Sequence, residues 1–229
     1  MHRLCWLTLA LGVLPSPAPG QEKKQPKPDP VFAKITDVPG LPRVLLIGDS
    51  ISMGYTLPVR KLFDGKANVH RVLENGGPTT NGVAKIDKWL NVNGSNKWDV
   101  IHFNWGLHDL KVTKEGNQVN PDEYEKNLRQ LVKKLKATGA KLIWATTTPV
   151  PEGKLSPPRK NEDVILYNTI SLKIMKEEGV AVNDLYAAVL PKQKEWQRKE
   201  NVHFTDAGSR TLADLVFKAI NQELGPKTK

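Results

Sequence analysis

The chain has almost no cysteine: Cys5 is the only one in 229 residues. It falls in the apolar segment that opens the chain, without the small residues that should precede a lipid-bearing cysteine. Removal of that segment leaves no thiol, which excludes disulfides, metal–thiolate sites and cysteine nucleophiles from the rest of the protein. For an exported protein, this lack of disulfides favours a bacterial source over a small disulfide-stapled domain.

Long apolar runs are also missing. The apolar segment at residues 4–14 is too short to cross a bilayer. It follows a short basic start and precedes Ala18 and Gly20, which occupy the two small positions of a cleavage site. We therefore predict a signal peptide over residues 1–20, and a secreted or periplasmic protein with no membrane span.

Acidic residues are outnumbered by basic ones, 24 to 34, and the formal net charge is +10. No basic stretch is interleaved with aromatic residues, so nucleic acid is set aside as a partner. Most lysines are expected on solvated helix faces. An anionic polysaccharide or a negatively charged envelope is the partner that this charge would suit.

The remaining length suits one well-buried α/β domain. We interpret residues 21–40, rich in proline and lysine, as a linker and residues 41–229 as that domain. Apolar runs of strand length then alternate with amphipathic segments, which predicts a three-layer α/β/α domain around a parallel, flavodoxin-like sheet with strand order 2-1-3-4-5. The predicted strands are 43–47, 69–73, 100–104, 141–146 and 180–183, and the predicted helices are 52–63, 82–91, 121–138, 161–178 and 205–223.

The first of these strands ends in an unusual sequence. The apolar run 44–47 leads directly into Gly48-Asp49-Ser50, and helix-compatible sequence follows. Ligands bind at the carboxyl ends of parallel strands, and a helix N-terminus favours negative charge. Ser50 is therefore a candidate nucleophile. The alternative is that Asp49 and Ser50 only close the turn and cap the helix.

A candidate base lies far downstream. His203 can serve Ser50 once folding brings the two together, and Glu200, three residues earlier, can reach back to orient the second ring nitrogen. Thr205 or Asp206 caps the next helix and so holds the histidine just before it. The alternatives are a partly buried structural histidine and an exposed glutamate.

Four short blocks follow one another along the chain: Gly48-Asp49-Ser50, Gly76-Gly77, Gly106-Leu107-His108-Asp109 and Glu200-Asn201-Val202-His203. Together they resemble the blocks of the SGNH (GDSL-type) hydrolases, in that family's order. Ser50 is not in the G-x-S-x-G turn of the α/β-hydrolases. The resemblance implies ester hydrolysis through an acyl-serine intermediate without cofactor or metal ion, with Ser50 as nucleophile, His203 as base and then acid, and Glu200 as its orienter.

The resemblance also implies an oxyanion hole. Its donors would be the backbone amides of Ser50 and Gly77, with Gly76 as the alternative, and the side chain of His108. Two residues depart from the family pattern, because the family normally has asparagine at the position of His108 and aspartate at that of Glu200.

The first departure has a chemical consequence. A neutral imidazole donates from one nitrogen only, so His108 can serve the oxyanion only with its N–H aimed inward or when protonated. Asp109, Asn104 or a nearby backbone carbonyl is expected to set that tautomer.

The remaining histidines, Trp105 and one long loop are not assigned to the catalytic machinery. His70 and His102 lie in or at the start of predicted strands and are expected to be packing residues. Trp105 suits a sugar platform and a core position equally well. The proline-rich loop 149–161 is too long for a simple connector and is expected to rim the active crevice or to be a solvated loop. In the first case, three cationic side chains would face the substrate: Lys154, Arg159 and Lys160.

The sequence thus predicts a secreted bacterial serine esterase that removes acetyl or another short acyl group from a small-molecule or polysaccharide ester. A lipid esterase or lysophospholipase is one alternative. Another is a catalytically weak glycan-binding protein with the same fold.

Overall fold

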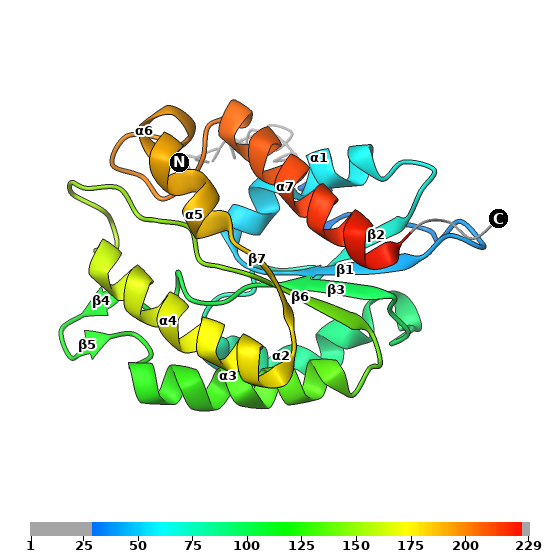
Figure 1. The fold of residues 1–229 in the computed structure, drawn as a ribbon, viewed down its shortest axis with the longest axis horizontal. Helices are drawn as coiled ribbons and strands as arrows, with labels where there is room; N and C mark the ends of the chain where they lie inside the picture. The colour runs from blue at the N-terminus through cyan, green and yellow to red at the C-terminus, as the bar shows by residue number, and fades with distance from the viewer. Residues whose placement is uncertain (1–28, 226–229) are drawn as a thin grey trace, which may run out of the picture.

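The computed structural model describes residues 29–225 (Figure 1). The predicted signal peptide and residues 21–28 of the predicted linker lie outside this range. No helix within it is both long and apolar enough to cross a membrane.

Five parallel strands form the central sheet, in the order β2-β1-β3-β6-β7. Counted along the chain, this is the predicted order 2-1-3-4-5. Buried apolar residues predominate in the central strands because both faces of the sheet are covered. The strands are β1 (Arg43–Ile47), β2 (Asn68–Arg71), β3 (Val100–Phe103), β6 (Lys141–Ala145) and β7 (Ala181–Asn183).

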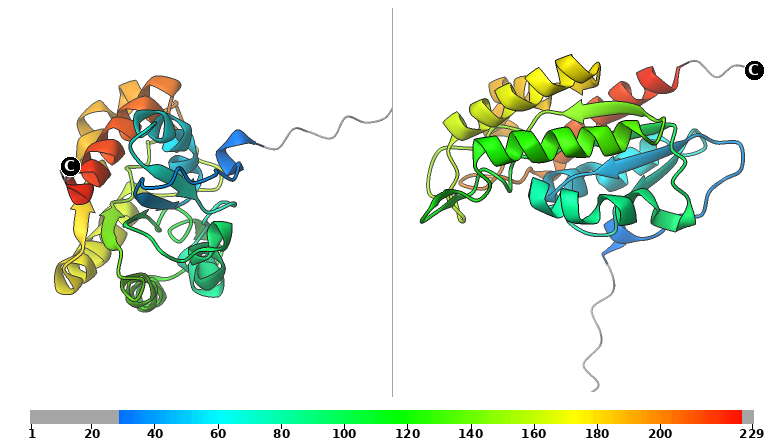
Figure 2. Two further views of the ribbon diagram at one scale, coloured as in Figure 1. Left: turned by 90° about the vertical axis from the view of Figure 1, so that its right-hand side faces the viewer. Right: turned by 90° about the horizontal axis from the view of Figure 1, so that it is seen from below.

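Helices cover both faces of the sheet, so that the molecule has three layers (Figures 1 and 2). Two separate apolar clusters fill the spaces between the sheet and the two helical layers. One layer holds α2 (Thr79–Leu90), α3 (Pro121–Lys136) and α4 (Asn161–Glu178), and the other holds α1 (Ser50–Leu62), α5 (Leu185–Val189), α6 (Gln193–Trp196) and α7 (Asp206–Leu224).

Local sequence explains where the long helices begin and end. Asn120 caps α3 by accepting from the amide of Glu123 at 2.9 Å, and Pro121 occupies the first turn, where its missing N–H costs nothing. Helix α4 ends at Gly179, whose φ of 65° is the left-handed conformation that a helix stop favours.

Helices α1 and α7 lie side by side on one face of the sheet (Figure 1). The rings of Phe63 and Phe217 pack across this interface at a tilt of 52°, with centroids 4.6 Å apart. Closer to the site, the helices approach so closely at Gly54 that a Cβ there would lie 3.2 Å from Ser209 Oγ. We call this contact between the two helices the α1–α7 seam.

The structure also contains short elements that the sequence patterns did not predict. A small antiparallel hairpin and two short helices, α5 and α6, lie in stretches for which the sequence predicted no helix or strand. The remaining short elements are β4 (Val112–Thr113), β5 (Gly116–Asn117) and the 3-10 turns η1 (Pro30–Phe32), η2 (Val92–Gly94) and η3 (Leu190–Lys192).

The predicted linker needs a correction at its carboxyl-terminal part. Residues 29–40 pack against the domain, since Val31 is only 3% exposed. The Arg60 guanidinium donates to the carbonyls of Pro30 and Ala33 at 3.3 and 3.2 Å, and the amide of Val38 donates to Asn68. One apolar side chain and several polar contacts therefore hold this part of the predicted linker on the sheet edge and α1, while most of its other side chains stay exposed.

Three residues with open or structural interpretations lie in the interior. Trp105 is 1% exposed and packs beside Phe103, so it is a core residue and not a sugar platform. His70 is buried with Nε2 2.5 Å from Asp37 Oδ1, and His102 is fully buried. The prediction that both histidines are packing residues is confirmed.

Candidate active site

Ser50 is the first residue of α1, directly after the turn that ends β1. Asp49 caps the helix, because its Oδ1 accepts from the amide of Ile51 at 2.9 Å. The capping role therefore belongs to Asp49 and not to the serine. The Ser50 side chain is left free to face the carboxyl edge of the sheet.

A buried arginine stabilises the Gly48-Asp49-Ser50 turn through hydrogen bonds to its backbone carbonyls. Arg71, at the end of β2, is 1% exposed and donates to the carbonyls of Gly48 and Asp49 at 2.9 and 3.2 Å. It also donates to Ser52 Oγ at 2.5 Å. Burial lowers the pKa of Arg71 to about 10, so the guanidinium stays protonated at neutral pH. Sequence reasoning missed this residue, although a charged side chain inside a fully buried strand was a usable signal.

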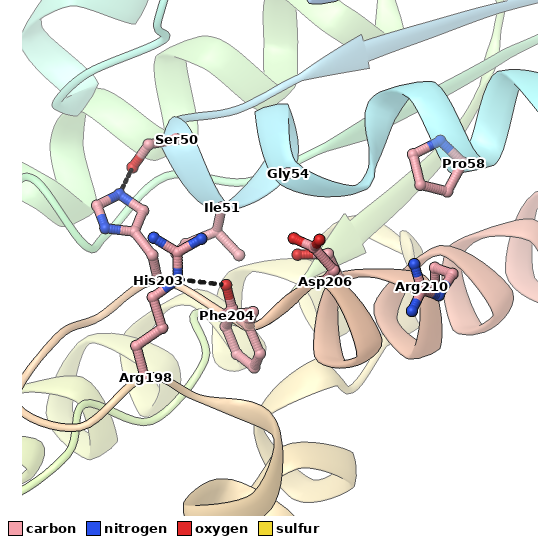
Figure 3. A pocket seen from close by; sticks show the side chains of 10 residues that line it. Ser50, Ile51, Gly54, Pro58, Arg198, His203, Phe204, Asp206 and Arg210 are labelled. Carbon is pink, nitrogen blue, oxygen red and sulfur yellow. Dashed lines mark hydrogen bonds between the residues drawn. The ribbon is translucent and has the colours of Figure 1, made fainter.

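Folding brings Ser50 and His203 together across 153 positions of sequence, with Ser50 Oγ 2.8 Å from His203 Nε2 (Figure 3). The other ring nitrogen, Nδ1, lies 2.7 Å from Asn201 Oδ1. That oxygen also accepts from the His203 backbone N–H at 2.9 Å, which identifies it as the carbonyl end of the amide. Nδ1 must then carry the proton, and Nε2 presents its lone pair to the serine hydroxyl.

Burial lowers the pKa of the His203 imidazole. The Asp49 carboxylate opposes this shift, while the positive charges of Arg198 and Arg159 add to it. Because the pKa lies below its usual value, the ring is neutral at pH 7 and stays neutral somewhat below the pH at which a free histidine is half protonated. His203 is therefore in the basic form that proton abstraction requires.

The second block of the sequence, Gly76-Gly77, lies against the Gly48-Asp49-Ser50 turn, but its backbone amides already have hydrogen-bond acceptors. The Gly76 N–H donates to the Gly48 carbonyl at 3.0 Å, and the Gly77 N–H donates to Asn75 Oδ1 at 2.9 Å. Gly77 has a φ of 60°, and a Cβ there would collide with Asn81. In this structure neither glycine offers the free amide that was expected for an oxyanion.

The third block places His108 in the same cavity as Ser50 and His203. Burial is the main cause that lowers the pKa of the His108 ring, so it is neutral at pH 7. Asp109 does not set its tautomer, because Asp109 Oδ1 accepts from the amide and hydroxyl of Thr79 at 2.8 and 2.5 Å. Asn104 donates instead to the Ala145 carbonyl at 2.8 Å. The expectation that either residue holds the imidazole is wrong.

Two cavities meet at the Ser50–His203 pair. The first, of about 370 Å³, lies under the loop 149–161, and we call it the loop crevice. The prediction that this loop rims the site is confirmed, with Lys154 and Arg159 lining the crevice. Lys160 is the N-cap residue of α4 and does not line the crevice. The other polar lining residues are Asn75, His108, Lys111, Ser156, Glu200 and Asn201.

The second cavity, of about 320 Å³, lies between the start of α7 and α1, and we call it the helix crevice (Figure 3). Arg198 and Arg210 line it together with Asp206. Arg198 Nε donates to the Phe204 carbonyl at 3.1 Å. Neither guanidinium has a carboxylate within ion-pair distance among residues 29–225.

The profile of the GDSL-like lipase/acylhydrolase family matches residues 46–211, which include Ser50, the glycine turn, His108 and His203. The chain belongs to this family. It is therefore an ester hydrolase with the α/β SGNH fold. Across the part of the chain that the structure describes, no cluster of three or more His, Cys, Asp or Glu side chains is arranged to hold a metal ion.

Solved structures of GDSL-like and SGNH hydrolases share the fold over most of the chain. An acetyl xylan esterase, AlAXEase, aligns with a TM-score of 0.66 and 19% identity, over 78% of this chain and 100% of its own. A lipase/acylhydrolase from Enterococcus faecalis gives 0.67 and 21%, over 82% and 100%. The acetylxylan esterase Axe2 from Geobacillus stearothermophilus gives 0.61 and 20%, over 81% and 95%. No curated protein sequence matches the chain.

One geometric expectation for this GDSL-like hydrolase is wrong. Glu200 makes no hydrogen bond with His203, and Asn201 takes that place. Glu200 has a φ of 48°, and its side chain lies against Gly153 in the loop 149–161, where a Cβ would come within 2.8 Å of Glu200 Cγ. Asn201 suits the role of orienter because its Oδ1 accepts from the His203 backbone N–H, which closes a local turn, and also contacts Nδ1 of the ring.

This geometry makes a test possible on two neighbouring residues. Asn201→Ala should lower kcat by about 10²-fold, because the ring loses the acceptor that holds its tautomer. Glu200→Gln is the matched control and should leave kcat close to the wild-type value. Steady-state kinetics on a soluble ester measures both. Equal losses, or a loss in Glu200→Gln alone, would restore Glu200 as the orienting residue.

Proposed function

We propose that this protein is a secreted bacterial serine esterase that removes acetyl or another short acyl group from carbohydrate. The 2.8 Å contact between Ser50 Oγ and His203 Nε2, with Nδ1 held by Asn201, is the observation that carries the proposal. The predicted signal peptide supports export. The family membership supports the ester chemistry.

The geometry suits a two-step mechanism. Ser50 Oγ attacks the ester carbonyl as its proton passes to His203 Nε2, and the carbonyl electron pair moves onto oxygen. Collapse of the tetrahedral intermediate breaks the bond to the alcohol, which leaves with the proton from Nε2. Water then loses a proton to Nε2 and attacks the acyl carbon. The second collapse returns the proton to Ser50 and releases the carboxylic acid.

The surroundings of Ser50 favour a small acyl group on a polar alcohol. The loop crevice is lined largely by charged and polar side chains. The helix crevice combines charged side chains with three apolar ones, Ile51, Pro58 and Phe204. A fatty-acyl chain would need a long apolar channel to leave water. The acetyl xylan esterases among the structural neighbours are consistent with carbohydrate as the alcohol.

Acetate release separates this proposal from its alternatives. Purified protein should release acetate from acetylated polysaccharides and hydrolyse short-chain model esters faster than long-chain ones. A preference for long fatty-acyl esters would favour a lipid esterase or lysophospholipase. Glycan retention without turnover, and without labelling of Ser50 by a fluorophosphonate, would favour a glycan-binding protein.

The cationic loop crevice adds a prediction about the glycan itself. Lys154 and Arg159 line the cavity, whereas Lys160 lies outside it. Replacing the first two with Gln should raise KM for an acidic acetylated glycan by about three- to tenfold, because exposed ion pairs contribute up to about 1 kcal/mol each. KM for a small neutral ester should stay unchanged.

Lys160→Gln is the control for total charge in the same loop. Thermal unfolding of each variant should accompany the kinetics, because Arg159 Nε also donates to the Leu107 carbonyl at 2.8 Å. Equal KM changes for acidic and neutral substrates, or an equal effect of Lys160→Gln, would remove the case for an anionic substrate.

A further inference from the structure

The ester oxygen becomes negatively charged when Ser50 attacks, and it needs hydrogen-bond donors aimed at it. The backbone amides of Gly76 and Gly77 already donate to Gly48 and Asn75. An oxyanion hole that used either glycine would first have to break one of these bonds. The donors must therefore be sought among other groups that face the loop crevice.

Asn75 is such a group. It is partly buried and lines the loop crevice with Ser50 and His108. The next residue, Gly76, is held against the turn before Ser50, because its amide donates to the Gly48 carbonyl at 3.0 Å. Asn75 is thus held close to the serine by the backbone and not only by its own side chain.

The orientation of the Asn75 amide follows from its hydrogen bond. Oδ1 accepts from the Gly77 N–H at 2.9 Å, which identifies the oxygen and therefore the nitrogen. Nδ2 has no hydrogen-bond partner among the described residues. The side chain therefore carries two unused donors in the cavity where the oxyanion forms.

We infer that Asn75 Nδ2 donates a hydrogen bond to the oxyanion, together with the Ser50 N–H and the His108 ring. Asn75 is then a catalytic residue, and its amide supplies the kind of donor that the third block lacks at His108. The inference rests on the proposed function, because it needs Ser50 as the nucleophile. Gly77 acts indirectly, by holding Oδ1 so that Nδ2 faces the ester.

Asn75→Asp tests the donor directly, because the carboxylate keeps the acceptor for Gly77 and has nearly the same shape but no N–H. It should lower kcat by at least about 10²-fold with little change in KM, the loss typical of one oxyanion donor. Asn75→Ala removes donor and acceptor without adding charge, and its kcat should fall by a similar factor. Thermal unfolding of Asn75→Asp should match the wild type, since the turn is preserved.

The pair of variants decides between the roles of Asn75. A slow Asn75→Ala enzyme beside a normal Asn75→Asp enzyme would show that the residue only supports the turn. A slow Asn75→Asp enzyme beside a normal Asn75→Ala enzyme would show a charge effect. Either result overturns the inference. Ser50→Ala, measured alongside, separates the two proposals. If this variant keeps wild-type turnover, the proposed function is wrong. If it is inactive, the Asn75 variants test only the role of Asn75.

Discussion

Ser50→Ala is expected to reduce ester hydrolysis to near background, a loss on the order of 10⁶-fold in kcat. The reason is that the substitution removes the hydroxyl proposed to attack the ester, which lies 2.8 Å from His203 Nε2. Because the substitution removes one oxygen atom at a partly exposed position, the temperature of thermal unfolding should not change. Hydrolysis of a chromogenic short-chain ester, followed beside a melting curve, measures both quantities.

His203→Ala should cost about as much as Ser50→Ala, and the double variant no more than either. Nucleophile and base act as one unit, so their losses do not add. A fluorophosphonate should label the wild type at Ser50 and fail to label either variant efficiently. Wild-type turnover in Ser50→Ala would show that the proposed mechanism is wrong.

His108→Ala is expected to have the next largest effect, a fall in kcat of about 10²–10³-fold with little change in KM. The ring lies in the loop crevice with Ser50 and makes no hydrogen bond to another described residue, so either tautomer can turn its N–H toward the ester oxygen. An oxyanion donor matters only in the transition state, which is why kcat should change and KM should not.

His108→Asn is the matched variant, because it supplies the amide donor usual for this family. It should keep substantial activity and remove any step in the pH–rate profile that comes from this imidazole. A His108→Ala enzyme with normal kcat and lower thermal stability would instead show that His108 only supports its loop. The Ser50 N–H and Asn75 would then hold the oxyanion without it.

The sequence predicted the architecture well because apolar periodicity and strong helix signals determine it. Helix α4 has the predicted bounds, and β1 ends where the apolar run meets Gly48. The hairpin β4–β5 and helices α5 and α6 were missed, because such short elements depend on tertiary contacts more than on their own propensities.

The site was only partly predictable. Ser50 and His203 lie in motifs whose spacing carries chemistry, so sequence alone could place them. Glu200 was predicted as the orienter because it lies three residues before His203. Backbone conformation decides which side chain reaches the ring, and the motif does not reveal the φ of 48° at Glu200. Arg71 was missed because the carbonyl and hydroxyl groups that accept its hydrogen bonds come together around it only on folding.

The α1–α7 seam has a consequence for engineering this enzyme. Ser50 is the first residue of α1 and His203 lies just before α7, so the distance between Ser50 and His203 depends on how the two helices pack. Gly54 and Ser209 allow their close approach, and neither forms part of the Ser50–His203 hydrogen-bond chain. A misplacement of a reacting group by about 1 Å can lower the rate by about 10²-fold. Substitutions along the α1–α7 seam should therefore change kcat. A library that varies them would change the distance between Ser50 and His203 without replacing either residue.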